Sequence, residues 1–169
     1  MGGAGIYVWL RLYLLVFDGN MKKGKNLFRS KNLVINTSPE IKMSELIGEY
    51  ASDYINMGET TEERQSFLNG ACTAWNVAIL PEHSREGAIR RVIEEYKRAN
   101  PDADDVGDFD HDLRILVRKK LEMFPDIRKT ILGATIEPIS GAKYRINIAS
   151  TDDRSLLKQM LSRKRVSNS

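Results

Sequence analysis

The stretch "RQSFLNGACTAWNVAILPE", Arg64 to Glu82, has no charged residue between its two ends. Its apolar side chains recur at three- and four-residue steps, which is the spacing of one helix face. They are Phe67, Leu68, Ala71, Cys72, Trp75, Ala78 and Ile79. Many of the intervening residues are small, so neighbouring backbones can approach closely. The stretch predicts a central helix over about 61–80, opened by Thr60 or Thr61 with two glutamates and closed by Pro81.

Three more helices are predicted around it. One covers about 39–57, beginning with Ser38 as a cap before Pro39 and ending at Gly58. The others cover about 84–99 and 108–124, and each stops near a proline. Four amphipathic helices must bury their apolar faces against one another, so a helical middle is expected.

After Pro125 the pattern changes to strands. Tyr144, Ile146 and Ile148 alternate with polar residues, and Ser140-Gly141 offers a turn, which together predict a β-hairpin over about 129–149. A final helix is expected to carry Leu156, Leu157, Met160 and Leu161, followed by a frayed basic tail at 164–169. The predicted class is α+β, with one domain over 38–163.

The N-terminal residues 1–37 have two interpretations. The apolar run from Ile6 to Phe17 is much shorter than the roughly 20 residues that span a bilayer, and its aromatic and β-branched content favours a strand. Residues 1–37 are therefore either a β-hairpin or the product of a mis-assigned start, with the true start at Met21 or Met43. A lone cysteine, Cys72, excludes an internal disulfide and favours a cytoplasmic setting.

Asn69, Thr73 and Asn76 form a narrow polar line on the uncharged helix. Buried amides need hydrogen-bond partners, so one interpretation is that these side chains bond to adjacent backbone. The other is that they line an uncharged groove that recognises a partner.

The aspartate-rich segment, "NPDADDVGDFDHDL" from Asn100 to Leu113, contains six aspartates and a histidine. Local electrostatics suffice to explain it, because acidic residues near a helix start complement the helix dipole, and Asp108 is the expected cap. Asp104, Asp108 and Asp110 would then also attract a basic partner.

The same segment resembles the calcium loop of EF-hand proteins when counting starts at Asp102. Asp104, Gly107, Asp108 and Asp110 then occupy the third, sixth, seventh and ninth positions. The fifth position is Val106 and the twelfth, where a bidentate glutamate belongs, is Leu113, so two ligands of that pattern are missing.

The pair His111-Asp112 also resembles the His-Asp pair of HD-domain phosphohydrolases. That resemblance implies a divalent metal, with His83 as a further ligand and Asp126 or Asp152 as another. The full set of candidate metal ligands is His83, Asp102, Asp104, Asp108, Asp110, His111 and Asp112.

The net charge of +3 is unevenly distributed over the 169 residues. Residues 1–42 carry +5, residues 43–113 carry −10, and residues 114–169 carry +8. The basic final third, with "RKK" at 118–120 and with Arg145, Arg163, Lys164 and Arg165, could contact nucleic-acid phosphate. No phosphate loop, nucleophile elbow or Cys-His pair indicates catalysis.

The sequence therefore predicts an interaction or accessory domain that binds a macromolecule, either a protein partner or a second copy, through separate acidic and basic surfaces. A metal-dependent hydrolase that uses His111 and Asp112 is the alternative, and a nucleic-acid-associated protein is the third hypothesis. No membrane association and no cofactor other than a divalent metal are expected.

Overall fold

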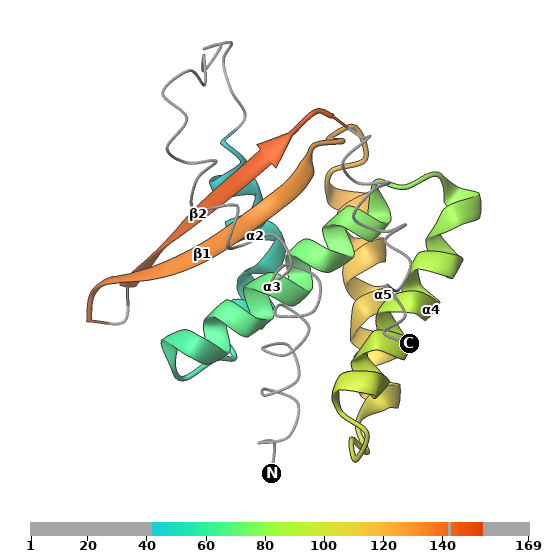
Figure 1. Ribbon diagram of the computed structural model, residues 1–169. Helices are drawn as coiled ribbons and strands as arrows, with labels where there is room; N and C mark the ends of the chain where they lie inside the picture. Colours follow the sequence, from blue (N-terminus) through green and yellow to red (C-terminus); the bar gives the residue numbers. More distant parts are fainter. Residues whose placement is uncertain (1–41, 142, 154–169) are drawn as a thin grey trace, which may run out of the picture.

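The computed structural model describes residues 42–141 and 143–153, and this part is α+β as predicted. Its helices are α2 (Met43–Ile55), α3 (Thr61–Ala78), α4 (Glu82–Ala99) and α5 (Val106–Met123), and its strands are β1 (Thr130–Ser140) and β2 (Lys143–Thr151) (Figure 1). The predicted N-terminal hairpin, C-terminal helix and basic tail lie outside the described residues. None of the described helices combines the length and the apolar character needed to cross a membrane.

Of the four described helices, α3 is the one whose start is fixed by a side-chain cap. At the start of α3, Thr60 accepts a hydrogen bond from the Glu63 amide while the Glu63 carboxylate accepts one from the Thr60 amide, which confirms the predicted capping box. The prediction was wrong at two other helix starts. Lys42 is extended, so α2 begins at Met43 rather than near 39. Asp105 occupies the cap position of α5, which places Asp108 inside the first turn.

Helix α3 is the central element, as the absence of charge predicts. It packs against α2, α4, α5 and β1, and its buried residues extend almost all round from Ser66 to Ala78. Trp75 lies at the middle of the core, with its ring edge-on to Tyr50 at 5.5 Å between centroids. A helix buried on several sides cannot carry charge without a desolvation cost, which explains the composition of the stretch.

The hairpin is antiparallel and irregular in two places. Gly141 in the turn has a φ of +59°, a conformation that glycine adopts without steric cost, so the predicted Ser140-Gly141 turn is confirmed. The register pairs Ala134 with Ile148 and Ile136 with Ile146. Before these pairs the register shifts at Leu132, and β1 therefore holds one residue more than β2 at that point.

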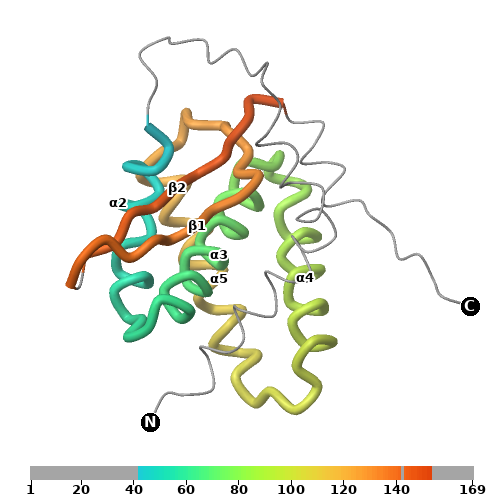
Figure 2. The backbone as a smooth tube through the Cα atoms, turned by 60° about the vertical axis from the view of Figure 1, so that its left-hand side comes forward, coloured from blue at the N-terminus to red at the C-terminus, as the bar shows by residue number. Residues whose placement is uncertain are grey.

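The two ends of the molecule are built differently. In both views the hairpin crosses the upper half, where β1 packs on α3 and β2 on α2, while the turn between α4 and α5 forms the lower end (Figures 1 and 2). The hairpin and the aspartate-rich segment are therefore spatially separate, as well as separate in the sequence.

Candidate functional site

The aspartate-rich segment forms the turn between α4 and α5 and the first half of α5. The turn is anchored from inside by Tyr96, whose ring stacks on Phe109 at 4.2 Å between centroids and whose hydroxyl donates a hydrogen bond to the Asp105 carboxylate. Tyr96 and Phe109 are both buried. The stacked Tyr96 and Phe109 thus anchor the segment, and Asp105 is bound to the Tyr96 hydroxyl.

Three aspartates of this segment face solvent. Asp102, Asp104 and Asp108 are exposed, and none of them forms an ion pair with any other described residue. Asp108 lies in the first turn of α5, where its charge is favourable to the helix dipole. We call Asp102, Asp104 and Asp108 the free aspartates.

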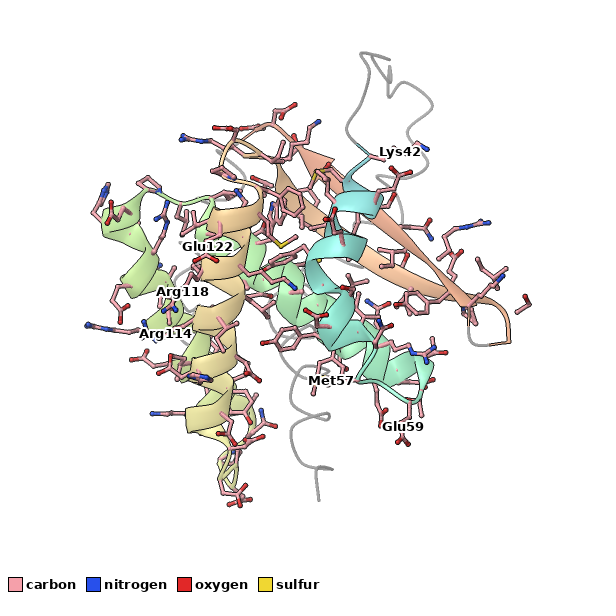
Figure 3. All side chains as sticks on the ribbon, turned by 180° about the vertical axis from the view of Figure 1, so that it is seen from behind. Lys42, Met57, Glu59, Arg114, Arg118 and Glu122 are labelled. Carbon is pink, nitrogen blue, oxygen red and sulfur yellow. The ribbon has the colours of Figure 1, made fainter. Side chains whose placement is uncertain are left out.

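Asp110, farther along the segment, is engaged within the protein. Asp110 accepts a hydrogen bond of 2.7 Å from Arg114, whose guanidinium also binds both carboxylate oxygens of Glu86 on α4 at 2.8 and 3.0 Å. Hydrogen bonding by Arg114 lowers the pKa of Glu86 to about 2. Arg114 and Arg118 follow the side of α5 that lies next to α4 (Figure 3). Asp110 is therefore part of the link between the two helices.

Asp112 is half-buried, and burial raises the pKa of its carboxyl. It faces α2, where its charge is close enough to contribute to the raised pKa of Tyr54, whose main cause is burial. One turn farther along the same face of α5, Ile115 is 37% exposed, and Met57 after α2 is 64% exposed. Ile115 and Met57 are therefore exposed apolar side chains on α5 and just after α2.

The predicted metal ligands do not converge. Within residues 42–141 and 143–153, no three histidine, cysteine, aspartate or glutamate side chains are grouped so that they could hold a metal ion. His83 is the exposed second residue of α4, so the length of that helix, about 25 Å at 1.5 Å per residue, separates it from the start of the segment at Asn100. Among the described residues, His83, His111 and the aspartates of the segment thus form no group of three that could hold an ion.

The resemblance to a calcium loop is also not realised in three dimensions. Helix α5 begins at Val106, so the fifth to twelfth positions of the proposed loop are helical. A calcium loop wraps its oxygens around the ion, whereas a helix directs successive side chains outwards in different directions.

The polar line on α3 is directed at β1. The Asn76 carboxamide makes two hydrogen bonds of 2.9 Å with Ile131, donating to its carbonyl and accepting from its amide. One turn beyond the predicted line, Gln65 donates to the Ala134 carbonyl at 3.0 Å and accepts from the Ile136 amide at 2.8 Å. Both side chains hydrogen-bond to β1 as a neighbouring strand would. The prediction that Asn76 bonds to backbone is confirmed.

The other two members of the line bond within α3. The Thr73 hydroxyl donates to the Asn69 carbonyl, and the Asn69 side-chain oxygen accepts from Gln65. Asn69 is buried, and its side-chain nitrogen has no hydrogen-bond partner among the described residues. Recognition of a partner by Asn69, Thr73 and Asn76 stays a prediction, and Asn69 and Asn76 are covered by protein.

Lys120 does not belong to a basic surface, contrary to the prediction that placed it with Arg118 and Lys119. It is 1% exposed, its ammonium lies 5.0 Å from the ring centroid of Trp75, and it donates to the carbonyls of Phe124 and Ile127 at 2.8 and 2.7 Å. Burial lowers the pKa of Lys120 to about 8. Its place on the apolar stripe, four residues after Leu116, is a sequence signal for this burial.

Two hollows complete the surface. One, of about 360 Å³, runs between α4 and α5, with an apolar floor that includes Ile89 and Val117 and a charged rim. The other, of about 470 Å³, lies where the tip of the hairpin meets the start of α3, next to Arg64 and Tyr144. The Arg64 guanidinium lies 5.3 Å from the Tyr144 ring centroid. The Arg64 guanidinium is therefore already engaged within the protein.

Of the four predicted nucleic-acid contacts after the helices, Arg145, Arg163, Lys164 and Arg165, only Arg145 lies in the described part of the chain. It is exposed on β2 and opposite Glu137 on β1, an arrangement that partly neutralises it. Arg163, Lys164 and Arg165 lie outside the described residues, so a nucleic-acid surface stays a prediction.

Comparison of the chain with protein-family models, curated proteins and solved structures finds no match.

Proposed function

We propose that the chain is a protein-interaction domain that binds a basic surface of a partner protein through its aspartate-rich segment. The observation that carries the proposal is the contrast within that segment. Asp105 and Asp110 are used for internal bonds, whereas the free aspartates Asp102, Asp104 and Asp108 are exposed at one end of the molecule.

The chemistry of the surroundings supports this function. Asp102, Asp104 and Asp108 form no ion pair with any described residue and lie within seven positions of one another. Together they produce a local negative field that speeds encounter with a positively charged surface. The exposed apolar side chains of Ile115 and Met57 would supply the desolvated contact that charged rims alone do not provide. The stacked Tyr96 and Phe109 hold the turn in one conformation, which lowers the entropic cost of binding.

The test is affinity capture with the full chain from an extract of its own cells, followed by titration of the purified partner. The variant Asp102→Asn/Asp104→Asn/Asp108→Asn should weaken binding by about tenfold or more, since each exposed charge contributes a few tenths of a kcal/mol to about 1 kcal/mol. Binding by the unmodified chain should also weaken as salt rises.

The matched control is Glu49→Gln/Glu62→Gln/Glu94→Gln, which changes the net charge equally at exposed positions on three other helices. It should retain the partner. Equal loss in both variants would indicate a general charge effect and contradict a role of the aspartate-rich segment. Unchanged binding in the aspartate variant would do the same.

A further inference from the structure

The two edges of the sheet are treated differently by the rest of the protein. The edge of β1 is covered by α3, because Gln65 and Asn76 bond to the outward-facing main-chain groups of Ile131, Ala134 and Ile136. The bulge at Leu132 makes this possible, since it lets Ile131 and Ala134 face α3 although they are three residues apart.

These bonds also reveal the orientation of β2. In an antiparallel pair, directly opposite residues either both face the partner strand or both face away from it. Ala134 and Ile136 face away from β2, so their opposite residues Ile148 and Ile146 face away from β1. The same alternation places the main-chain groups of Tyr144 on the outer edge of β2. Its opposite residue, Pro138 on β1, faces away from β2, so the missing amide hydrogen of Pro138 costs no ladder bond.

The outer edge of β2 therefore presents the amides and carbonyls of Tyr144, Ile146 and Ile148. Within residues 42–141 and 143–153, no side chain or main chain forms a hydrogen bond with this edge outside the hairpin ladder. β2 contains no proline and no extra residue, two features by which proteins commonly block an edge. An open and regular edge of this kind can accept another strand.

We propose that β2 pairs antiparallel with β2 of a second copy of the chain, across a twofold axis at Ile146. This goes beyond the proposed function, because the edge of β2 is remote from the aspartate-rich segment (Figure 1). In that register Ile146 pairs with its own counterpart and Tyr144 pairs with Ile148 of the second copy. Roughly six main-chain hydrogen bonds would form, two in each of three pairs. The two hairpins would become one four-stranded sheet.

The side chains of β2 suit a second copy of itself. On the face toward the core, the new pairs would bring together the apolar side chains of Tyr144, Ile146 and Ile148, which are only partly buried in one copy. On the outer face, Arg145 would lie opposite Asn147 of the second copy, and Lys143 opposite Ala149. No two like charges would face each other directly, although the exposed face of β2 is basic.

The test is sedimentation analysis of the full chain over a concentration series, with substitutions at Asn147. Asn147 is exposed, so changes there leave the core intact. Asn147→Lys would put a lysine opposite Arg145 twice in the dimer and should weaken dimerisation about tenfold. Asn147→Glu would create two opposite-charge pairs and should strengthen it by a similar factor.

The matched controls are Thr135→Lys and Thr135→Glu. Thr135 is exposed on the same face, directly opposite Asn147 but on β1, one strand farther from the proposed interface. Their effects should be much smaller. Opposite shifts for the two Asn147 variants, with little change at Thr135, support the proposal.

A chain that remains monomeric at every concentration overturns the proposal, and so does a dimer that is insensitive to both Asn147 variants. The result is independent of the partner capture described above. A dimer could form while the aspartate variant still binds its partner normally, and the reverse could also occur.

Discussion

The two edges of the hairpin differ in whether other parts of the protein hydrogen-bond to their outward-facing main-chain groups. Along β1, the side-chain carboxamides of Gln65 and Asn76 on α3 hydrogen-bond to the strand. The main-chain groups on this edge are thus satisfied without another strand. Along β2, the described residues supply nothing equivalent. The lesson is that polar residues on a buried helix can decide where a sheet stops, and so which edge remains for association.

The largest expected effect comes from removing Asn76, the buried one of the two side chains that bond to the edge of β1. Asn76→Ala would leave the amide and the carbonyl of Ile131 buried without partners, and the free energy of unfolding should fall by about 2–4 kcal/mol. Chemical denaturation measures this. The control is Thr73→Ala, which removes a hydroxyl bonded only within α3 and should cost under about 1 kcal/mol. Equal losses in the two variants would show that Asn76 has no special role at the edge.

A second prediction concerns the segment that leads into β1, where Lys120 holds two carbonyls and Trp75 donates to the Lys129 carbonyl at 2.9 Å. The pKa of Lys120 is lowered to about 8 by burial, below its value of about 10.4 in an unfolded chain. Between these two values the unfolded chain binds more protons, so the contribution of Lys120 to stability increases as pH rises. Below about pH 8 the full cost of burying its charge is present.

The comparison needed is between the unmodified chain and Lys120→Met. As pH rises from 7.5 to 10, the unmodified chain should gain about 1–3 kcal/mol of unfolding free energy relative to Lys120→Met. In a Trp9→Phe background Trp75 is the sole tryptophan, and its fluorescence should titrate with a midpoint near pH 8. A difference that stays constant over this range would contradict the assignment.

The smallest expected effect is that of Gln65, the more exposed of the two side chains that bond to the edge of β1. Gln65 is only partly buried, so water can replace its bonds, and Gln65→Ala should lower the unfolding free energy by about 1–2 kcal/mol. Amide hydrogen exchange gives a local readout. The Ile136 amide should exchange faster in this variant, whereas the Ile131 amide, held by Asn76, should not. Unchanged exchange at Ile136 would mean that Gln65 does not protect the edge.

Much of the fold could be predicted because its signals are local. Helical periodicity, prolines and the capping pair Thr60 and Glu63 locate α3, and alternation with a glycine turn locates the hairpin. Asp108 was wrongly expected to cap α5, because several aspartates in a row fit a cap equally well and the sequence offers no way to choose. The packing of Tyr96 on Phe109 makes the choice, since it draws Asp105 to the Tyr96 hydroxyl.

The candidate site was predictable only as a composition. The six aspartates are evident in the sequence, but which of them are engaged depends on other elements. Tyr96 of α4 binds Asp105, and Arg114, which meets Glu86 across two helices, binds Asp110. Gln65 was missed, although it continues the line of Asn69, Thr73 and Asn76 by one helical turn. Lys120 was assigned to the wrong environment, although its position four residues after Leu116 puts it on the apolar stripe. The two carbonyls and the Trp75 ring that hold its ammonium come together only on folding.

By itself, the sequence determined the four central helices, the hairpin and the uncharged character of α3, because each depends on residues within a few positions of one another. Only the tertiary structure decided which aspartates stay free and which edge of the hairpin is covered. Those outcomes depend on partners far apart along the chain, such as Asn76 with Ile131 and Gln65 with Ile136, whose meeting requires the whole core to form around α3.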